Sequence, residues 1–280
     1  MKKDKKNIPI VFMVAGMSSR FGGIPKPFVQ VGPNNETLIE IMVDYSIKNG
    51  FGKIVFIVGD KTENLFKSKF GVEYKGKPVF YAKQSIDAET RDKPWGTCEA
   101  VVLAKDFIDD DFVVCNGDDF HSEEAIKMIF DFISNNDVSA AVGGDLIESL
   151  PDIGTVNRGV FFTDEKGYIN EIKEVIGISK ENYKQHGLFE NNLVNHSIML
   201  LNRKNLLILE KYLVEFKLNH DGDRKSECYL PVELSRLIKS GNIIIKLLRA
   251  PENLIGVTNP GDELILKKFL TEKLTTSSKS

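Results

Sequence analysis

The chain has 280 residues, of which 42% are hydrophobic and 28% charged, and its formal net charge is −3. A chain of this size and composition can bury a large core without a disulfide or metal staple, and its charge balance does not indicate a nucleic-acid partner. The three cysteines are far apart and form no C-x-x-C motif, which favours a reducing, cytoplasmic setting. No stretch approaches the roughly 20 apolar residues of a membrane span, so no membrane partner is expected.

Strand and helix patterns alternate through the first half of the chain. Residues 8–15 form an apolar run ended by Gly16, which is typical of a strand buried on both faces. Thr37 and Glu40 have the spacing of a capping box, before a helix that Gly50 would end. Similar patterns predict strands at 53–58, 78–82, 112–115 and 138–142, and helices at 62–70, 97–107 and 122–134.

The second half is richer in short strands. The sequence predicts strands at 156–163, 168–173, 196–201 and 243–249, helices at 204–217 and 228–240, and a last helix from about residue 260, with a disordered end from 275. We therefore predict an α/β fold, a doubly wound, mostly parallel Rossmann-like mixed sheet flanked by helices, with a smaller β-rich half. The expected organisation is one domain, 1–280, with halves at about 8–150 and 151–270 and a tail at 271–280.

The segment A-G-M-S-S-R-F-G-G-I-P-K-P, residues 15–27, follows the first strand, where ligands bind in doubly wound sheets. Small residues at Gly16, Ser18 and Ser19 would let backbone N–H groups approach phosphate oxygens. Arg20 and Lys26 would add positive charge. The loop has neither P-loop nor G-x-G-x-x-G spacing, and the alternative is an ordinary strand-to-helix connection with surface cations.

Two further candidate segments lie next to predicted secondary structure, one after a strand and one before a helix. Asp118 and Asp119, in N-G-D-D, come directly after a predicted strand, where they can hold a hard cation or simply form a turn. In P-W-G-T, Thr97 is a candidate N-cap and Trp95 a packing residue. The four histidines have no ligand spacing, so we expect surface or satisfied buried groups.

Taken in order, these segments and the late G-V-T-N-P-G-D, residues 256–262, resemble the sugar-1-phosphate nucleotidyltransferase (nucleotide-sugar pyrophosphorylase) superfamily, over about residues 8–270. G-P-N-x-E-x-x-I, D-Y-S-I and G-F-G-K-I-V-F, between residues 32 and 56, resemble a bacterial subgroup of undefined substrate. The resemblance implies a GT-A-like nucleotidyltransferase fold.

The resemblance also implies roles for matching positions. Nucleotide contacts would come from Ala15, Gly16, Met17, Ser18, Ser19, Arg20, Lys26, Gln84, Gly96 and Thr97. Arg20, Lys26 and Asp118 would be catalytic. The cofactor would be Mg²⁺, held by Asp118 and Asp262, with Asn259 as the alternative to Asp262.

For the second substrate, the implied binding positions are Asp119, Gly154, Glu174 and Asn195. His196 and Ser197 depart from the Thr-Gly pair that usually follows this asparagine, which leaves the sugar open. The inserted segment 85–93, between Gln84 and the G-T pair, would alter or cover the base pocket.

The implied function is transfer of a nucleotide from a nucleoside triphosphate to a sugar 1-phosphate, with release of pyrophosphate. The alternatives are a cytidylyltransferase acting on a non-sugar phosphate, such as a phosphocholine-like or polyol phosphate, a glycosyltransferase and a non-catalytic nucleotide-sugar sensor. The paired Arg20 and Lys26 argue against the glycosyltransferase. The resemblance also implies that the chain can form homo-oligomers; base, sugar and pathway stay open.

Overall fold

The computed structural model describes residues 7–16, 23–133, 135–251 and 261–277. Its strands are β1 (Pro9–Met13), β2 (Lys53–Gly59), β3 (Glu73–Tyr74), β4 (Lys77–Gln84), β5 (Asp111–Asn116), β6 (Ser139–Asp145), β7 (Val156–Thr163), β8 (Ile169–Ile178), β9 (Leu193–Asn202) and β10 (Ile245–Arg249). Its α-helices are α1 (Leu38–Asn49), α2 (Glu63–Phe70), α3 (Thr97–Leu103), α4 (Glu123–Ile133), α5 (Arg203–Asn219), α6 (Leu230–Lys239) and α7 (Asp262–Ser277).

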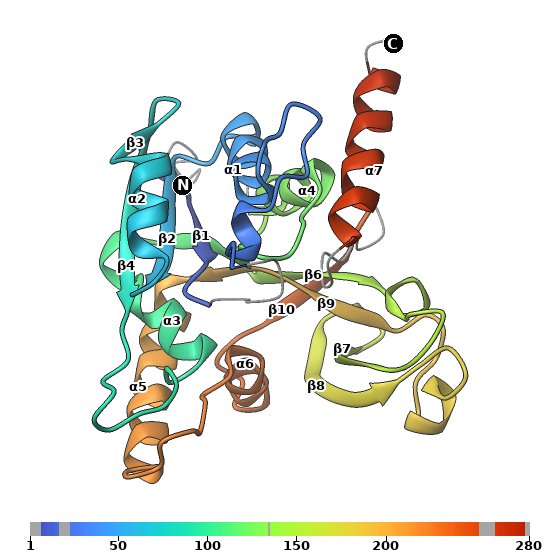
Figure 1. Ribbon diagram of the computed structural model, residues 1–280. Helices are drawn as coiled ribbons and strands as arrows, with labels where there is room; N and C mark the ends of the chain where they lie inside the picture. The colour runs from blue at the N-terminus through green and yellow to red at the C-terminus, as the bar shows by residue number, and fades with distance from the viewer. Residues whose placement is uncertain (1–6, 17–22, 134, 252–260, 278–280) are drawn as a thin grey trace.

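The strands join into one mixed sheet with the order β10-β6-β9-β5-β1-β2-β4-β3, to which β7 and β8 attach beside β9 (Figure 1). Strand β1 pairs in parallel with β2 and β5, and β2 pairs in parallel with β4, so four carboxyl ends meet at one edge. Strand β9 runs antiparallel between β5 and β6. The predicted fold class is confirmed, and the two halves share a sheet because β9 comes from the second half.

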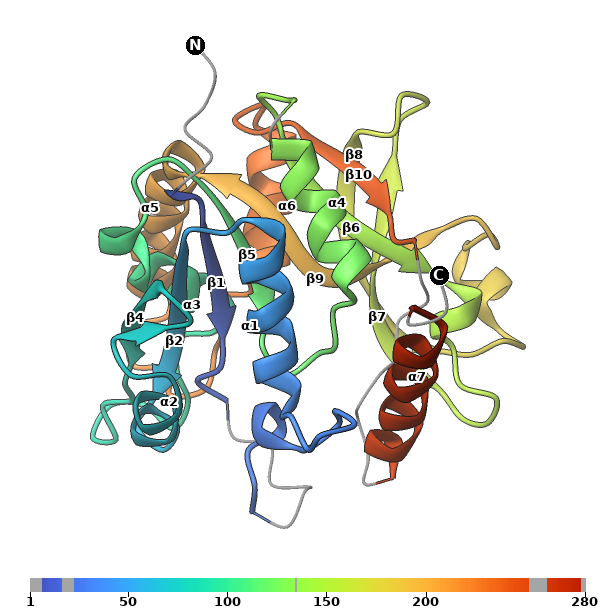
Figure 2. The ribbon, with the colours of Figure 1, turned by 90° about the horizontal axis from the view of Figure 1, so that it is seen from above.

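Helices cover both faces of this sheet. Helices α1, α2, α4 and α7 lie on one face and α3, α5 and α6 on the other (Figures 1 and 2). Successive strand residues point to opposite faces, so Phe12 packs into the first layer and Val11 into the second. Burying each such side chain contributes about 1.5–3 kcal/mol relative to leaving it exposed.

The capping box predicted at the start of α1 is confirmed, since Thr37 accepts from the Glu40 backbone and the Glu40 carboxylate accepts from the Thr37 backbone. Gly50 ends this helix with φ 108°, as expected. The short strand β3 was not predicted. It pairs with β4 in a hairpin whose turn holds Lys75 and Gly76 at positive φ.

At the other end of the chain, α7 continues to Ser277, so the described part of the predicted tail is helical. The predicted helix over 97–107 is α3 followed by a separate 3₁₀ turn, Lys105–Phe107. None of the helices in the described ranges combines the length and apolar composition that crossing a membrane requires.

Candidate active site

A first cavity of about 370 Å³ opens at the edge where the parallel strands end. It is lined by Met13, Val14, Ala15, Gly16, Pro27, Gln84, Pro94, Gly96, Thr97, Ala100, Asn116, Asp118 and Glu227. Six of these residues are among the predicted site positions, and they come from four separate stretches of the sequence. The fold thus brings together five of the expected nucleotide contacts, Ala15, Gly16, Gln84, Gly96 and Thr97. Lys26 does not line the cavity, and Met17, Ser18, Ser19 and Arg20 lie outside the described residues.

Lys26 connects the loop after β1 with the loop after β5. It begins a 3₁₀ turn, Lys26–Phe28, and only 8% of its surface is exposed. Its Nζ lies 3.3 Å from Asp119 Oδ1 and 3.6 Å from Asp118 Oδ2. A second hydrogen bond comes from Asn116, whose Nδ2 donates to Asp119 Oδ2 at 3.0 Å. Asp119 is therefore held on both oxygens by the protein.

The pKa values of the two neighbouring carboxyls are shifted in opposite directions. Burial and the charge of Asp119 raise the pKa of Asp118 above its ordinary value. Burial also disfavours the charged form of Asp119, but the Lys26 charge and the Asn116 hydrogen bond outweigh it and lower that pKa. Asp118 thus shares the Lys26 ammonium with Asp119 and is the more weakly paired of the two carboxyls.

Gly96, rather than Thr97, forms the cap of α3, so the capping role predicted for Thr97 is wrong. Gly96 has φ 92°, and a Cβ there would lie 2.6 Å from the Cys228 carbonyl oxygen. The Thr97 hydroxyl instead accepts from the Leu230 N–H at 2.9 Å, which joins α3 to the start of α6. Thr97 nevertheless lines the first cavity.

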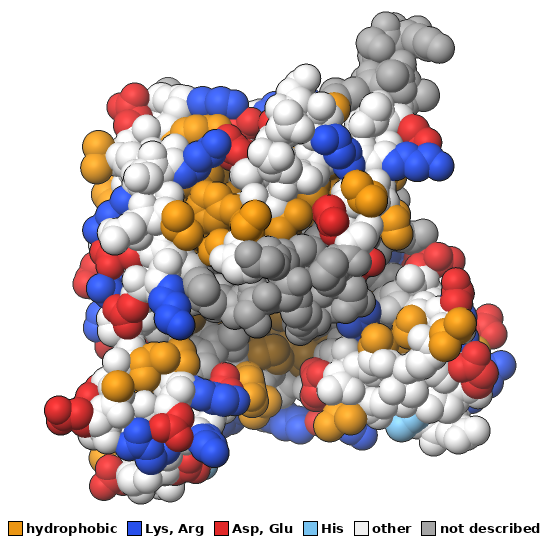
Figure 3. All heavy atoms as spheres, in the orientation of Figure 1, with side chains coloured by type: hydrophobic (Ala, Val, Ile, Leu, Met, Phe, Trp, Pro, Cys, Tyr) orange, Lys and Arg blue, Asp and Glu red, His pale blue; other side chains and the backbone are white. Residues whose placement is uncertain are grey.

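A second cavity of about 450 Å³ adjoins the first and shares Met13, Thr97 and Asn116 with it. Figure 3 shows a recess with hydrophobic side chains on its floor in this part of the molecule, between α6 and the β7–β8 pair. Glu174 and Asn195 line it, as predicted for the second substrate, together with a mostly apolar set: Val114, Ile172, Met199, Leu230, Pro231 and Val232. Burial raises the pKa of Glu174, and the Arg158 charge opposes this in part.

Gly154 does not reach this cavity. It is exposed, and a Cβ there would meet nothing within 4 Å. Gly159 takes the place expected for it, because the β7–β8 register sets Gly159 opposite Glu174. A Cβ on Gly159 would lie 3.4 Å from the Asn195 Cβ and 3.6 Å from Glu174 Oε2.

His196 departs from the family pattern, and Gly144 leaves the space that its imidazole occupies. The buried imidazole stands over Gly144, where a Cβ would come within 1.8 Å of His196 Nε2. Within the described part of the chain that Nε2 has no hydrogen-bond partner, and the same holds for Nδ1 of buried His121. The expectation of satisfied histidines is thus wrong for these two. Burial, with the charges of His121 and Arg158, lowers the pKa of His196 to about 4.

The inserted segment 85–93 is fastened to the loop that follows α5. Arg91 is 5% exposed and donates to the backbone oxygens of Asp223 and Ser226. Its guanidinium also stacks on Trp95, with Cζ 3.6 Å from the ring centroid. Trp95 is therefore a packing residue, as predicted.

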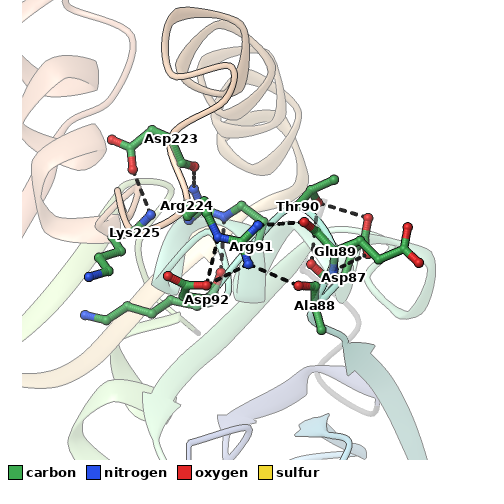
Figure 4. Close-up of polar contacts among 10 residues, drawn as sticks. Asp87, Ala88, Glu89, Thr90, Arg91, Asp92, Asp223, Arg224 and Lys225 are labelled. Atoms are coloured by element: carbon green, nitrogen blue, oxygen red, sulfur yellow. Dashed lines mark hydrogen bonds and ion pairs between the residues drawn. The ribbon is translucent and has the colours of Figure 1, made fainter.

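Arg224 connects the same two segments in the opposite direction. Figure 4 shows its guanidinium bonded to the Asp92 carboxylate and to the backbone oxygens of Ala88 and Glu89. A further ion pair joins Lys93 to Glu227, which lines the first cavity. The insertion accordingly braces a wall of the cavity, and among the described residues it contributes no lining side chain itself.

Asp262, the predicted second metal ligand, is the first residue of α7 and is absent from the lining of either cavity. Within the described ranges no group of three or more His, Cys, Asp or Glu residues is placed to hold a metal ion. Asn259 lies outside these ranges. The metal-binding role of Asp118 and Asp262 remains a prediction.

Comparison with known proteins identifies the family to which the chain belongs. The family model described as nucleotidyl transferase matches residues 12–220. The chain belongs to the nucleotidyl transferase family. Among curated relatives, the bifunctional protein GlmU of Methanococcus vannielii is 25% identical over 268 residues, which cover 94% of this chain and 55% of GlmU. This nucleotidyltransferase thus spans about half the length of the GlmU relatives it matches.

Solved structures confirm the fold. The inositol-1-phosphate CTP transferase from T. maritima matches with a TM-score of 0.68 and 14% identity, covering 95% of this chain and 97% of that one. A UDP-glucose pyrophosphorylase complexed with UDP-glucose matches with a TM-score of 0.65 and 17% identity, covering 95% and 99%. The family match and these relatives bear out the resemblance to nucleotidyltransferases on which the sequence interpretation rests.

The sequence interpretation missed several residues of the site. Gly159 had no signal in the sequence, because the register shift between Phe162 and Thr163 decides that it lies opposite Glu174. Glu227 and the segment that starts α6 line the cavities but follow no motif. Glu99 was also missed, because its partner Lys217 is 118 residues away.

Proposed function

We propose that this nucleotidyltransferase joins a nucleoside triphosphate to a sugar 1-phosphate and releases pyrophosphate. The observation that carries the proposal is the pair of adjoining cavities, which share Met13, Thr97 and Asn116. The first cavity would hold the triphosphate and the second the sugar phosphate. Asp118 lines the first cavity just after β5, and Lys26, which lines neither cavity, contacts it.

The reaction is an in-line displacement at the α-phosphorus. A phosphate oxygen of the sugar 1-phosphate forms the new P–O bond, and the bond from the α-phosphorus to the bridging oxygen of the β-phosphate breaks. The electron pair leaves with pyrophosphate. Because the attacking oxygen is already an anion, the step needs no general base, and catalysis rests on positioning and charge.

Lys26 would place positive charge at the reacting phosphates, and Arg20 would hold the triphosphate. Lys26 is well suited because its burial excludes water and its Nζ is fixed by two carboxylates. A substrate phosphate approaching this ammonium would replace part of the Asp118 contact. Charge stabilisation of this kind is stronger in a partly buried site than in water.

The residues present fit a magnesium ion. Mg²⁺ prefers oxygen ligands and usually takes one or two carboxylates plus substrate phosphates, so a large protein cluster is not needed. Asp118 fits because its raised pKa reflects burial beside another carboxylate, a charge that a cation would offset. Asp262 is the proposed second ligand. When bound, Mg²⁺ would offset the negative charge of the two phosphate groups.

A cytidylyltransferase acting on a non-sugar phosphate is the second candidate. The mostly apolar lining of the second cavity, with Ile172, Met199 and Leu230, favours the phosphocholine-like form of this candidate, whose acceptor carries few hydroxyl groups. The fold is compatible, since the inositol-1-phosphate CTP transferase shares it. Both candidates use the same first cavity and the same displacement.

The test is a pyrophosphate-release screen with Mg²⁺ that crosses UTP, CTP, dTTP, GTP and ATP with a panel of sugar 1-phosphates and polyol or choline phosphates. We expect release only with one triphosphate and one sugar 1-phosphate together. Release only with CTP and a non-sugar phosphate would replace the first candidate with the second. Binding of a nucleotide sugar without release in any combination would contradict both and indicate a sensor.

A further inference from the structure

The amide of Gln84 at the end of β4 can point in only one direction. Its Nε2 lies 3.1 Å from the Gly96 carbonyl oxygen and 3.0 Å from Glu99 Oε2. Both neighbours are acceptors without a hydrogen, so the reversed amide would set its oxygen against two oxygens. The NH₂ group therefore faces the protein. The Oε1 atom, which makes no hydrogen bond to the described residues, is presented to the first cavity that Gln84 lines.

Glu99 is itself fixed by two further groups. It is 8% exposed, and its Oε2 also accepts from the Trp95 N–H at 3.2 Å. Its Oε1 accepts from Lys217 Nζ at 2.6 Å, across the contact between α3 and α5. A series of hydrogen bonds thus runs from Lys217, at the surface of α5, through Glu99 to Gln84 at the first cavity. Its charged hydrogen bonds are stronger than neutral ones and resist rotation of the amide.

We propose that Glu99, held by Lys217, is a positioning residue that fixes the hydrogen-bond polarity with which Gln84 meets the nucleotide base. The inference rests on the proposed function in that it places the triphosphate in the first cavity. A fixed acceptor requires an N–H donor on the base. Uracil and cytosine have nearly the same shape and reversed donor and acceptor groups along one edge, and guanine and adenine are related in the same way. One member of a pair is therefore preferred.

The substitution Glu99→Gln removes this fixation while keeping the size of the side chain. Lys217 is a donor only, so it would donate its hydrogen bond to the amide oxygen of the substituted side chain. The new NH₂ would then face Gln84 Nε2 and the Trp95 N–H, which are donors. Gln84 can relieve this conflict only by turning its amide, which brings its NH₂ toward the base. The preference for one base polarity is then lost.

The experiment is titration calorimetry of UTP, CTP, GTP and ATP, with Mg²⁺, against wild type and three variants. In wild type we expect at least one reversed-polarity pair to differ in Kd by about 10- to 100-fold. Glu99→Gln should reduce that ratio by about tenfold, mainly by weakening the preferred triphosphate. Lys217→Met, at the surface end of this series of hydrogen bonds, should reduce it by a smaller factor.

Glu210→Gln is the matched control. Glu210 is another α5 residue in an ion pair, with Lys105 at 2.5 Å, and it lines neither cavity. It should leave the ratio unchanged. Equal weakening of both members of a pair by Glu99→Gln, an unchanged ratio, or no pair preference in wild type would overturn the inference. Because binding is measured without the acceptor, these results are independent of pyrophosphate release; failure of every triphosphate to bind would overturn the nucleotide site itself.

Discussion

The two cavities differ in how the polar groups of their walls and strands are satisfied. Around the first cavity, the buried side chains of Lys26, Gln84 and Glu99 all have protein partners. Beside the cavities, three buried atoms have no hydrogen-bond partner among the described residues: Arg158 Nε on β7, His196 Nε2 on β9, and Nδ1 of His121, whose Nε2 bonds to the Asn116 backbone oxygen. An unpaired buried polar atom costs about 1–3 kcal/mol. The polar lining of the first cavity is thus fixed by protein partners, while the unpaired atoms next to Glu174 and Asn195 carry a cost in stability.

The largest effect should follow from removing the charge at the first cavity. Lys26→Met keeps much of the side-chain volume but leaves Asp118 and Asp119 without their ammonium. Because the charge acts on the reacting phosphates, we expect kcat to fall about 100- to 1,000-fold, with a much smaller change in the KM for the triphosphate. Steady-state kinetics with the substrates found in the screen provides the measurement.

Lys48→Met is the control for this substitution. Lys48 is also a lysine paired with an acidic residue, Glu123, but its side chain is 68% exposed and far from both cavities. Its kinetics should match wild type. A Lys26→Met enzyme with wild-type kcat would remove the catalytic role of Lys26 and weaken the contrast between the cavities.

The buried, unpaired imidazole of His196, next to the second cavity, should make the stability of the protein depend on pH. The pKa of His196 is about 4 in the folded protein, below its ordinary value near 6.5. Between these values the unfolded chain binds more protons than the folded one, so stability decreases as pH falls from about 6.5 toward 4. Between pH 7 and pH 4.5 we expect wild type to lose about 2 kcal/mol more stability than His196→Gln, in which buried His121 still contributes a loss of the same sign.

Urea unfolding of both proteins at the two pH values tests this, with His186→Gln as the control because His186 is exposed. The variant His186→Gln should lose as much stability as wild type. If His196→Gln shows the same loss too, the unpaired imidazole is not the source of the acid sensitivity.

The sequence predicted the residues of the first cavity better than those of the second. The first cavity lies where parallel strands end, and a strand end followed by a glycine or polar loop is visible in the sequence. Lys26, Gln84 and Asp118 could therefore be predicted one motif at a time. The loop over 17–22 carries its strongest motif and lies outside the described residues.

The second cavity depends on register rather than on motifs. Whether Gly154 or Gly159 faces Glu174 is decided by how β7 pairs with β8, and the register of that pair shifts at two places. Thr97 shows a similar limit, because its capping potential was overridden by a hydrogen bond with Leu230, distant in sequence. Contacts between remote segments have no local signal, which is also why the Glu99–Lys217 pair was missed.

The smallest expected effect concerns Glu174 and the binding of the sugar phosphate in the second cavity. Glu174→Gln keeps the shape of the side chain but replaces a carboxylate, which only accepts hydrogen bonds, with an amide that also donates. If Glu174 receives hydroxyl groups of the acceptor, the KM for the sugar phosphate should rise about tenfold, since a hydrogen bond to a charged group contributes about 1.5–3 kcal/mol. The KM for the triphosphate should not change, because Glu174 does not line the first cavity.

Glu171→Gln is the matched control, on the same strand β8 but paired with Lys239 and outside both cavities. Equal effects of Glu174→Gln on both KM values would mean that the cavities are not separate binding sites. An effect on the acceptor alone, set beside an effect of Glu99→Gln on the triphosphate alone, would assign one substrate to each cavity. The shared residues Thr97 and Asn116 would then mark the place where the two phosphates meet.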